Sequence, residues 1–304
     1  MSIPSVSRYA IGLICAMCGA VLFSSKAIFI KFGYAIHADP LDLLFLRVLF
    51  AVPIFLAISL TSTKNAKTRL TKTQIGQVIL LGFLGYYLAS VCDFYGLTYI
   101  AANLERLILY LYPTLVLIFG RLFFKESITK QQGLSICITY LGIGMIVGIE
   151  TNSAASPNPL KGALFVGMSA LFYAAYIVFS GRIIPHIGPT RFTAMVMLAA
   201  TSFISIHYGL VNGFYLPTFD MTVYGLCLSL AIICTIIPTL LLSQAIHRIG
   251  SSHTALVGNV GPASTIILAH LCLGESLSTL QLLGVGVVML GIYALTIPQS
   301  TSAS

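Results

Sequence analysis

Charged residues are scarce in this sequence. Asp, Glu, Lys and Arg make up 8% of its 304 residues, against 58% hydrophobic residues, and the mean hydropathy is +0.97. A water-soluble globule of this length needs more polar side chains to cover its surface. The composition therefore argues against a soluble protein and predicts a chain embedded in a lipid bilayer.

The sequence also lacks the patterns of several common functions. It has no G-x-x-x-x-G-K-[ST] loop, which argues against ATP as the direct energy source, and no G-x-S-x-G, H-E-x-x-H or convergent His and Asp pair to indicate an enzyme. The net charge of +8 comes from cations spaced between apolar runs, so nucleic acid is not an expected partner. The histidines have no metal-ligand spacing, and we expect neither a metal nor a cofactor.

Long apolar runs dominate the sequence instead. A window of about 19 residues finds ten segments near the length of roughly 20 residues that a helix needs to cross a bilayer. The first run is too long for a signal-peptide core and lacks a convincing cleavage site, so we expect it to be retained. The predicted spans are 9–33, 40–61, 74–97, 101–123, 131–149, 161–184, 190–212, 221–246, 251–274 and 278–297.

The cations are distributed unequally among the loops that connect these spans. One side collects eleven Lys and Arg, whereas the other has only Lys31 and Lys161. Because loops rich in Lys and Arg remain on the cytoplasmic side, this bias predicts that both the N and the C terminus are cytoplasmic. We expect a multi-pass protein of the bacterial inner (plasma) membrane.

The second half of the sequence repeats the first at a constant offset of 149 residues. Without a gap, Pro113 falls on Pro262 and Pro40 falls on Pro189. Each half contains five predicted helices, an odd number, so the second half enters the membrane from the opposite face, and inverted repeats of this kind are typical of transporters. The predicted organisation is a first repeat over 9–149, a linker over 150–160 and a second repeat over 161–298.

Ionisable residues inside the predicted helices are costly in lipid and mark candidate functional positions. All of them belong to the first repeat and to the outer half of the membrane, where they could form one cluster. One interpretation is a set of structural ion pairs, such as Asp93 with Arg106 or Arg47, and for Arg47 this interpretation and a functional one both stay open. We expect the other four to bind substrate. The five residues are Lys26, Arg47, Asp93, Glu105 and Arg106.

Hydroxyl groups recur at helical spacing on one face of the third and of the sixth predicted helix. Facing lipid, they would lack hydrogen-bond partners, so both faces should look into the bundle. We favour a cavity there, and packing against other helices is the alternative. The two faces carry Tyr86, Ser90 and Asp93, and Ser169, Tyr173, Tyr176 and Ser180.

Two repeat-related prolines stand inside predicted helices. A mid-helix proline frees a backbone carbonyl and kinks the helix, and matched interruptions in both halves point to the central site of a transporter. Pro113 shares a helix face with Arg106 and Tyr110, and Pro262 shares one with Asn259. We expect Tyr110 and Asn259 near the substrate and the two prolines at kinks or gates. A kink that serves packing alone is the alternative.

Several segments resemble the EamA domain, two copies of which make up the ten-helix permeases of the drug/metabolite transporter superfamily. The resemblance implies a central cavity, alternating access and small-molecule substrates such as amino acids or other metabolites, without naming the cargo. The second half lacks the intramembrane charges, so binding should depend on the first repeat. The segments are Phe23 to Lys31, Leu46-Arg47 with Pro53, Asp93 to Leu97, Leu104 to Leu109, and Tyr112-Pro113-Thr114, with Glu126 and Glu275 as the usual acidic residues.

These observations predict a secondary permease, and we favour an exporter. Lys26 and Arg106 should receive a carboxylate or other anionic group of the substrate, and aromatic residues should cover its apolar part. Asp93 or Glu105 is a candidate for a coupling proton. The glycine-rich fifth and tenth helices allow either tight packing or a homodimer contact. The alternatives are a non-transporting subunit or scaffold and, with least support, an intramembrane enzyme.

Overall fold

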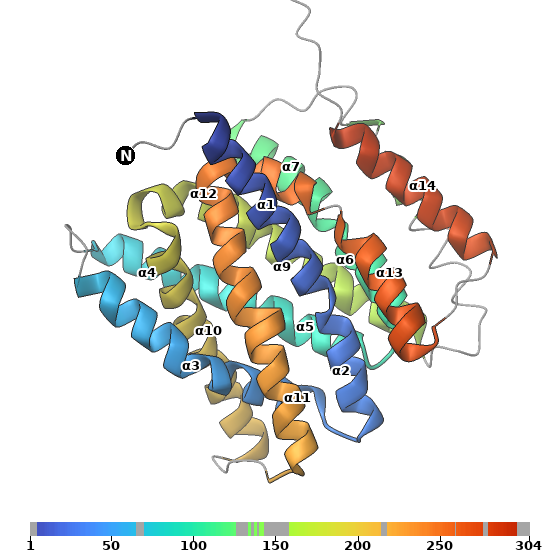
Figure 1. Cartoon of the computed structure of the whole chain (residues 1–304), viewed down its shortest axis with the longest axis horizontal. Helices are drawn as coiled ribbons and strands as arrows, with labels where there is room; N and C mark the ends of the chain where they lie inside the picture. The colour runs from blue at the N-terminus through green and yellow to red at the C-terminus, as the bar shows by residue number, and fades with distance from the viewer. Residues whose placement is uncertain are drawn as a thin grey trace, which may run out of the picture.

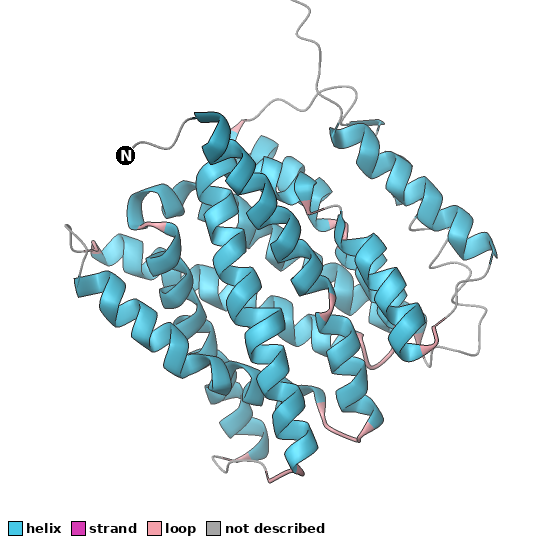
Figure 2. Cartoon of the chain, in the orientation of Figure 1, coloured by secondary structure: helices cyan, strands magenta, loops and turns pink. Residues whose placement is uncertain are grey.

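The computed structural model describes residues 5–64, 70–125, 133–134, 137–138, 140–142, 158–213, 218–258, 260–275 and 279–296. Within these residues every regular element is helical, as the apolar runs predict (Figure 2). The elements, with η for π-helical turns, are α1 (Ser5–Ser24), α2 (Lys26–Ala35), α3 (Pro40–Lys64), α4 (Lys72–Gly82), η1 (Phe83–Leu88), α5 (Ala89–Gly96), α6 (Ala102–Leu109), α7 (Tyr112–Phe124), α9 (Pro159–Ile187), α10 (Pro189–Asn212), α11 (Met221–Ala231), η2 (Ile232–Ile236), α12 (Ile237–Val257), α13 (Val260–Leu273) and α14 (Thr279–Thr296).

Among the described residues, seven helical stretches are long and apolar enough to cross a membrane. They agree with the first four predicted spans and with the sixth, seventh and eighth. The predicted fifth span, 131–149, and the linker lie largely outside the described residues. In the predicted ninth span only Ser264–Leu273 forms a separate, shorter apolar helix, and α14 coincides with the tenth. The total of ten therefore remains a prediction. The seven stretches are Arg8–Ala35, Pro40–Lys64, Lys72–Gly96, Ala102–Phe124, Pro159–Ile187, Pro189–Asn212 and Met221–Ala255.

The helices begin and end where the local sequence directs. Thr71 caps α4, because its side chain accepts from the backbone N–H of Gln74 while the Gln74 side chain accepts from the backbone N–H of Thr71. The Asn158 side chain caps α9 in the same sense. Between α9 and α10 the chain turns at Gly188, at φ +90°, directly before Pro189.

Element boundaries repeat at the offset found in the sequence. The helix α3 begins at Pro40 and α10 at Pro189, and α4 begins at Lys72 and α11 at Met221, each 149 residues later. Even the π-helical turns correspond, because η1 begins at Phe83 and η2 begins 149 residues later at Ile232. The two halves therefore share their local folding. Their opposite orientation in a membrane stays a prediction.

The halves pack against each other through equivalent helices. In the first half α1 contacts α12 and α13, and its counterpart α9 contacts α5 and α7, the counterparts of those two helices (Figure 1). The helices α3 and α10, which are also counterparts, contact each other. The first helix of each half therefore packs against helices of the other half.

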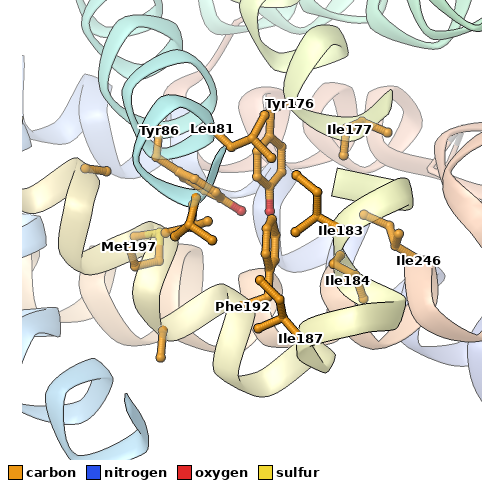
Figure 3. Close-up of a cluster of buried hydrophobic side chains, with 14 of the residues drawn as sticks. Leu81, Tyr86, Tyr176, Ile177, Ile183, Ile184, Ile187, Phe192, Met197 and Ile246 are labelled. Atoms are coloured by element: carbon orange, nitrogen blue, oxygen red, sulfur yellow. The ribbon is translucent and has the colours of Figure 1, made fainter. Parts of the chain in front are cut away.

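One hydrophobic cluster surrounds Tyr176 of α9 (Figure 3). The Tyr176 ring stacks on Phe192 of α10, with ring centroids 6.3 Å apart, and meets Tyr86 of η1 edge to face at 5.0 Å. Gly85 makes this approach possible, since a Cβ atom there would collide with the Tyr176 ring. The first π-helical turn is thereby fixed against α9.

Candidate functional site

An ion pair lies at the centre of the buried charged residues. Lys26, the first residue of α2, donates a hydrogen bond from Nζ to Oδ2 of Asp93 in α5 at 2.5 Å. The two residues are only 4% and 1% exposed. The sequence interpretation names Arg106 or Arg47 as partner of Asp93, and the structure gives Lys26 instead. The spacing along one helix could not reveal this pair, because its members come from different helices.

Arg47 lies close to the pair but has neutral partners. Its guanidinium donates to the Ser90 hydroxyl at 3.1 Å and lies 4.9 Å from the centroid of the Phe94 ring. The side chain is buried. The interaction with the Phe94 face and the single hydroxyl stabilises the cation only in part. The structural ion pair considered for Arg47 is therefore not formed with Asp93.

Arg106 of α6 contacts both halves of the chain. Its guanidinium donates to the Ser24 hydroxyl at 2.6 Å, next to the break between α1 and α2 at Ser25. A Cβ atom at Gly261 would come within 2.5 Å of the same guanidinium, so Arg106 packs directly on the start of α13. The side chain thus joins α6, α1 and α13.

Glu105 is completely buried beside this cluster. Its carboxyl group faces that of Asp93, with Lys26 and Arg106 as further electrostatic neighbours, and no N–H or hydroxyl group of the described residues donates to its oxygens. Burying a carboxylate without a donor is unfavourable. Glu105 is therefore the acidic group here that gains most from a proton or from a donor on a ligand.

Lys26, Arg47 and Asp93 line a small cavity, which we call the Lys26 cavity. Both π-helical turns contribute to it, through Tyr86 of η1 and, 149 residues later, Thr235 of η2. Such turns often occur at functional positions of helices. The lining residues are Phe23, Lys26, Arg47, Gly85, Tyr86, Ala89, Ser90, Asp93, Leu109, Ser169, Tyr173, Cys234 and Thr235.

A second small cavity, the Arg106 cavity, adjoins the first. Part of its wall is repeat-related to the wall of the first cavity, because Ala20, Pro238, Leu242 and Gly258 are the counterparts of Ser169, Ala89, Asp93 and Leu109. In this shared part the second cavity carries no charge where the first has Asp93. It is lined by Ala16, Gly19, Ala20, Phe23, Arg106, Leu109, Tyr112, Tyr173, Pro238, Leu242, Thr254 and Gly258.

Phe23, Leu109 and Tyr173 line both cavities and form the partition between them. The Phe23 and Tyr173 rings stack with centroids 6.0 Å apart, and Tyr112 meets Tyr173 edge to face at 5.2 Å. The Lys26 ammonium lies 5.1 Å from the centre of the Phe23 ring. The partition is thus an aromatic layer in direct contact with the ion pair.

The structure brings most of the sequence-predicted site residues together and leaves others outside the cavities. Glu105 lies behind the cavity walls, Tyr110 packs in a hydrophobic cluster of α6 and α9, and Tyr176 packs in the cluster of Figure 3. Asn259 lies outside the described residues. Those that line the Lys26 cavity are Lys26, Arg47, Tyr86, Ser90, Asp93 and Tyr173, and Arg106 lines the second cavity.

The prolines stand just after helix breaks rather than inside continuous helices. The helix α6 ends at Leu109 and α7 begins at Tyr112, one residue before Pro113. In the second half α12 ends at Val257 and α13 begins at Val260, two residues before Pro262. A helix accepts proline in its first turn, where no backbone donor is lost. The matched interruptions are present, and a gating role for them is a prediction.

Sequence reasoning missed Phe23 and Thr235 as cavity residues. Phe23 stands three residues before Lys26, the spacing at which side chains lie on the same helix face, but a break at Ser25 interrupts that helix. Thr235 is the repeat counterpart of Tyr86, so the offset of 149 could have found it. Adding 149 to the number of each candidate residue would have identified Thr235.

Comparisons with known proteins agree with this architecture. The model of the EamA-like transporter family matches residues 10–148 and 160–297. "Uncharacterized transporter YcbK" of Bacillus subtilis is 31% identical over 92% of this chain and 91% of its own length, and "Uncharacterized transporter sll1319" of Synechocystis sp. is 27% identical over 82% and 77%. A solved crystal structure with a TM-score of 0.70 covers 95% of this chain and 97% of its own, at 17% identity, and shows a shared fold.

Proposed function

Since the chain belongs to the EamA-like transporter family, we propose that it is a secondary permease that exports a small anionic or zwitterionic metabolite by alternating access. Membership of this family and seven apolar spans among the described residues make it a multi-pass membrane transporter rather than an enzyme. The proposal places it in the bacterial inner membrane with both termini cytoplasmic, as two inverted repeats of five helices each.

The observation that carries the substrate class is the excess of buried positive charge. Lys26, Arg47 and Arg106 line the two cavities, against two buried carboxyl groups, Asp93 and Glu105. Among the described residues only Lys26 forms an ion pair with a carboxylate, and the hydrogen bonds of the two guanidiniums go to the hydroxyls of Ser90 and Ser24. A buried guanidinium that donates to a neutral hydroxyl is stabilised less than one that donates to a carboxylate. A carboxylate or similar group on the substrate would accept charge-assisted hydrogen bonds from the guanidiniums and supply this stabilisation.

The arrangement of the cavities supports alternating access. In the predicted topology the Lys26 cavity lies toward the outer face and the Arg106 cavity toward the inner face, with the layer of Phe23, Leu109 and Tyr173 between them. Repeat-related cavities on either side of one layer give two halves that can exchange roles. We propose that this layer moves as the substrate passes from the inner to the outer cavity.

Glu105 is the proposed site of a coupling proton, with Asp93 as its neighbour. A proton on Glu105 would remove the penalty of a buried carboxylate that faces the Asp93 carboxyl group and receives no N–H or hydroxyl donor from the described residues. We expect Glu105→Gln, a neutral group of the same shape, to abolish the pH dependence of transport into proteoliposomes, and Asp93→Asn to alter it. Transport whose pH dependence is the same in both variants as in the wild type would exclude coupling through this pair.

The first experiment is thermal stabilisation of the purified protein across a panel of amino acids, organic acids, amines and nucleotides. Anionic or zwitterionic compounds should raise the Tm of the wild type and fail to raise that of Arg106→Ala. Arg182→Ala is the matched control, because Arg182 lies over the Phe124 ring away from both cavities. Selective stabilisation by amines that survives in Arg106→Ala would overturn the proposed substrate class.

A further inference from the structure

The carboxylate of Glu275 lies against the first turn of α6. Its two oxygens accept the backbone N–H groups of Ala102 at 3.0 Å and of Asn103 at 3.1 Å. Glu275 itself stands in the other half of the sequence, just after α13 and the turn at Gly274, where φ is +66°. The two halves are thus joined by a pair of hydrogen bonds from one side chain to one helix end.

The helix α6 needs an external contact of this kind. It has eight residues, it ends at the break before α7, and Ala101 at its N-cap position supplies no side-chain hydrogen bond. A helix this short has little stability of its own, and its first N–H groups have no partner within the helix. The negative charge of Glu275 also suits the positive end of the helix dipole.

The same two helices are joined at a second point. Arg106, on the turn after Ala102 and Asn103, packs on Gly261 at the start of α13, whereas Glu275 follows the end of α13. The backbone of Glu275 is fixed in turn, because its N–H donates to the Ala269 carbonyl at 3.3 Å. The contact between α6 and α13 is therefore held near both ends of α13.

We propose that Glu275 is a positioning residue of the transport site. By holding the first turn of α6 against the end of α13, it keeps Glu105, at the end of that turn, and Arg106, in the next turn, in the buried cluster. The role of Glu275 in transport rests on the proposed function, in which Arg106 receives the anionic group of the substrate. The position of α6 itself can be measured without any substrate.

The test is amide hydrogen exchange of the full-length protein in lipid nanodiscs, with Glu275→Ala and Glu275→Gln. In Glu275→Ala, exchange should rise at least tenfold across Ala102–Leu109, including the amides of Glu105 and Arg106. Glu275→Gln keeps one carbonyl oxygen that can accept, so it should restore part of the protection. Thr71→Ala is the matched control, since it removes the cap hydrogen bond that the Thr71 hydroxyl accepts from the backbone N–H of Gln74 in α4, and it should leave α6 unchanged.

Two results would overturn the proposal. One is faster exchange confined to Ala102 and Asn103, which would make Glu275 a local cap only, and the other is unchanged exchange throughout α6.

A functional readout separates failure of the positioning proposal from failure of the proposed function. If the panel anion that stabilises the wild type loses its effect in Arg106→Ala but binds Glu275→Ala with unchanged half-saturation, positioning fails and the anion site stands. If α6 loses protection while Arg106→Ala still binds the anion, the anion site fails and the positioning of α6 stands.

Discussion

The pairing of Lys26 with Asp93 sets the electrostatics of the whole cluster. The second half has uncharged residues at the two equivalent positions, because the repeat counterparts of Lys26 and Asp93 are Ala175 and Leu242. The charged pair is therefore not required by the helix packing as such. Its presence in one half only indicates a function that the other half does not perform.

Removing one member of the pair should therefore be far worse than removing both. We expect Lys26→Ala to destabilise the protein by about 3–5 kcal/mol, because it leaves Asp93 buried without its partner. The double variant Lys26→Ala with Asp93→Leu copies the second half and should recover most of that loss while transport stays abolished. The Tm of the purified variants checks the first statement, and a double variant no more stable than Lys26→Ala would contradict it.

Two glycines in neighbouring segments make a second test at the same scale. Gly85→Ala places a Cβ atom in collision with the Tyr176 ring, and we expect a loss of about 1–3 kcal/mol. At Gly76 in α4 a Cβ atom meets nothing within 4 Å, so Gly76→Ala should be neutral or stabilise the helix by up to about 1 kcal/mol. Equal Tm shifts in the two variants would show that the contact between Gly85 and Tyr176 is not a tight one.

At the scale of elements, the interruptions are what bring the site together. Breaks at Ser25 and at residues 110–111 and the two π-helical turns all lie at or beside the cavity-lining residues. A π-helical turn shifts the phase of the side chains that follow it, so η1 and η2 alter which residues of their helices face the Lys26 cavity.

The break at Gly250 yields a prediction through its repeat counterpart. Gly250 has φ +81° and ψ 166°, a conformation open essentially to glycine alone, whereas the counterpart Ala101 has φ −67° and ψ 157°. We expect Gly250→Ala to destabilise the protein by about 1–3 kcal/mol and Ala101→Gly to cost much less. The Tm values of the two variants compare them directly, and similar losses would contradict the assigned backbone strain.

At the scale of the whole molecule, the predicted topology can be tested directly. A single cysteine at His37, between α2 and α3, should react with a membrane-impermeant maleimide added to intact cells, and one at Lys64, at the end of α3, should react only after the membrane is opened. The native cysteines must first be replaced. The reverse pattern would invert the orientation and, with it, the side to which each cavity opens.

The homodimer contact, one of the two roles considered for the glycine-rich helices, would lie at the edge of the molecule. The helix α14 lies at one side of the chain, and a Cβ atom at Gly286 would meet nothing within 4 Å among the described residues (Figure 1). Mass measurement of the detergent-solubilised protein by light scattering should give a dimer, which Gly286→Leu should dissociate. A monomeric wild type would leave the glycines a role in packing within the chain.

The sequence by itself determined that the chain lies in a membrane, where most spans run, and which residues are candidates for the functional site. These follow from properties that act along the chain: the lengths of apolar runs, the spacing of side chains on one helix and an offset that repeats. The resemblance to the EamA domain followed from the same residues, and the family match confirms it.

Only the tertiary structure decided which of these residues meet. Lys26 pairs with Asp93, and Glu275 contacts α6, in each case across different segments of the chain. Tyr110 and Tyr176 are buried against other helices, away from the cavities. Distance along the chain carries no information about such pairs, since they depend on how helices cross and where they break. The sequence selected the candidates, and packing between the helices assigned their partners.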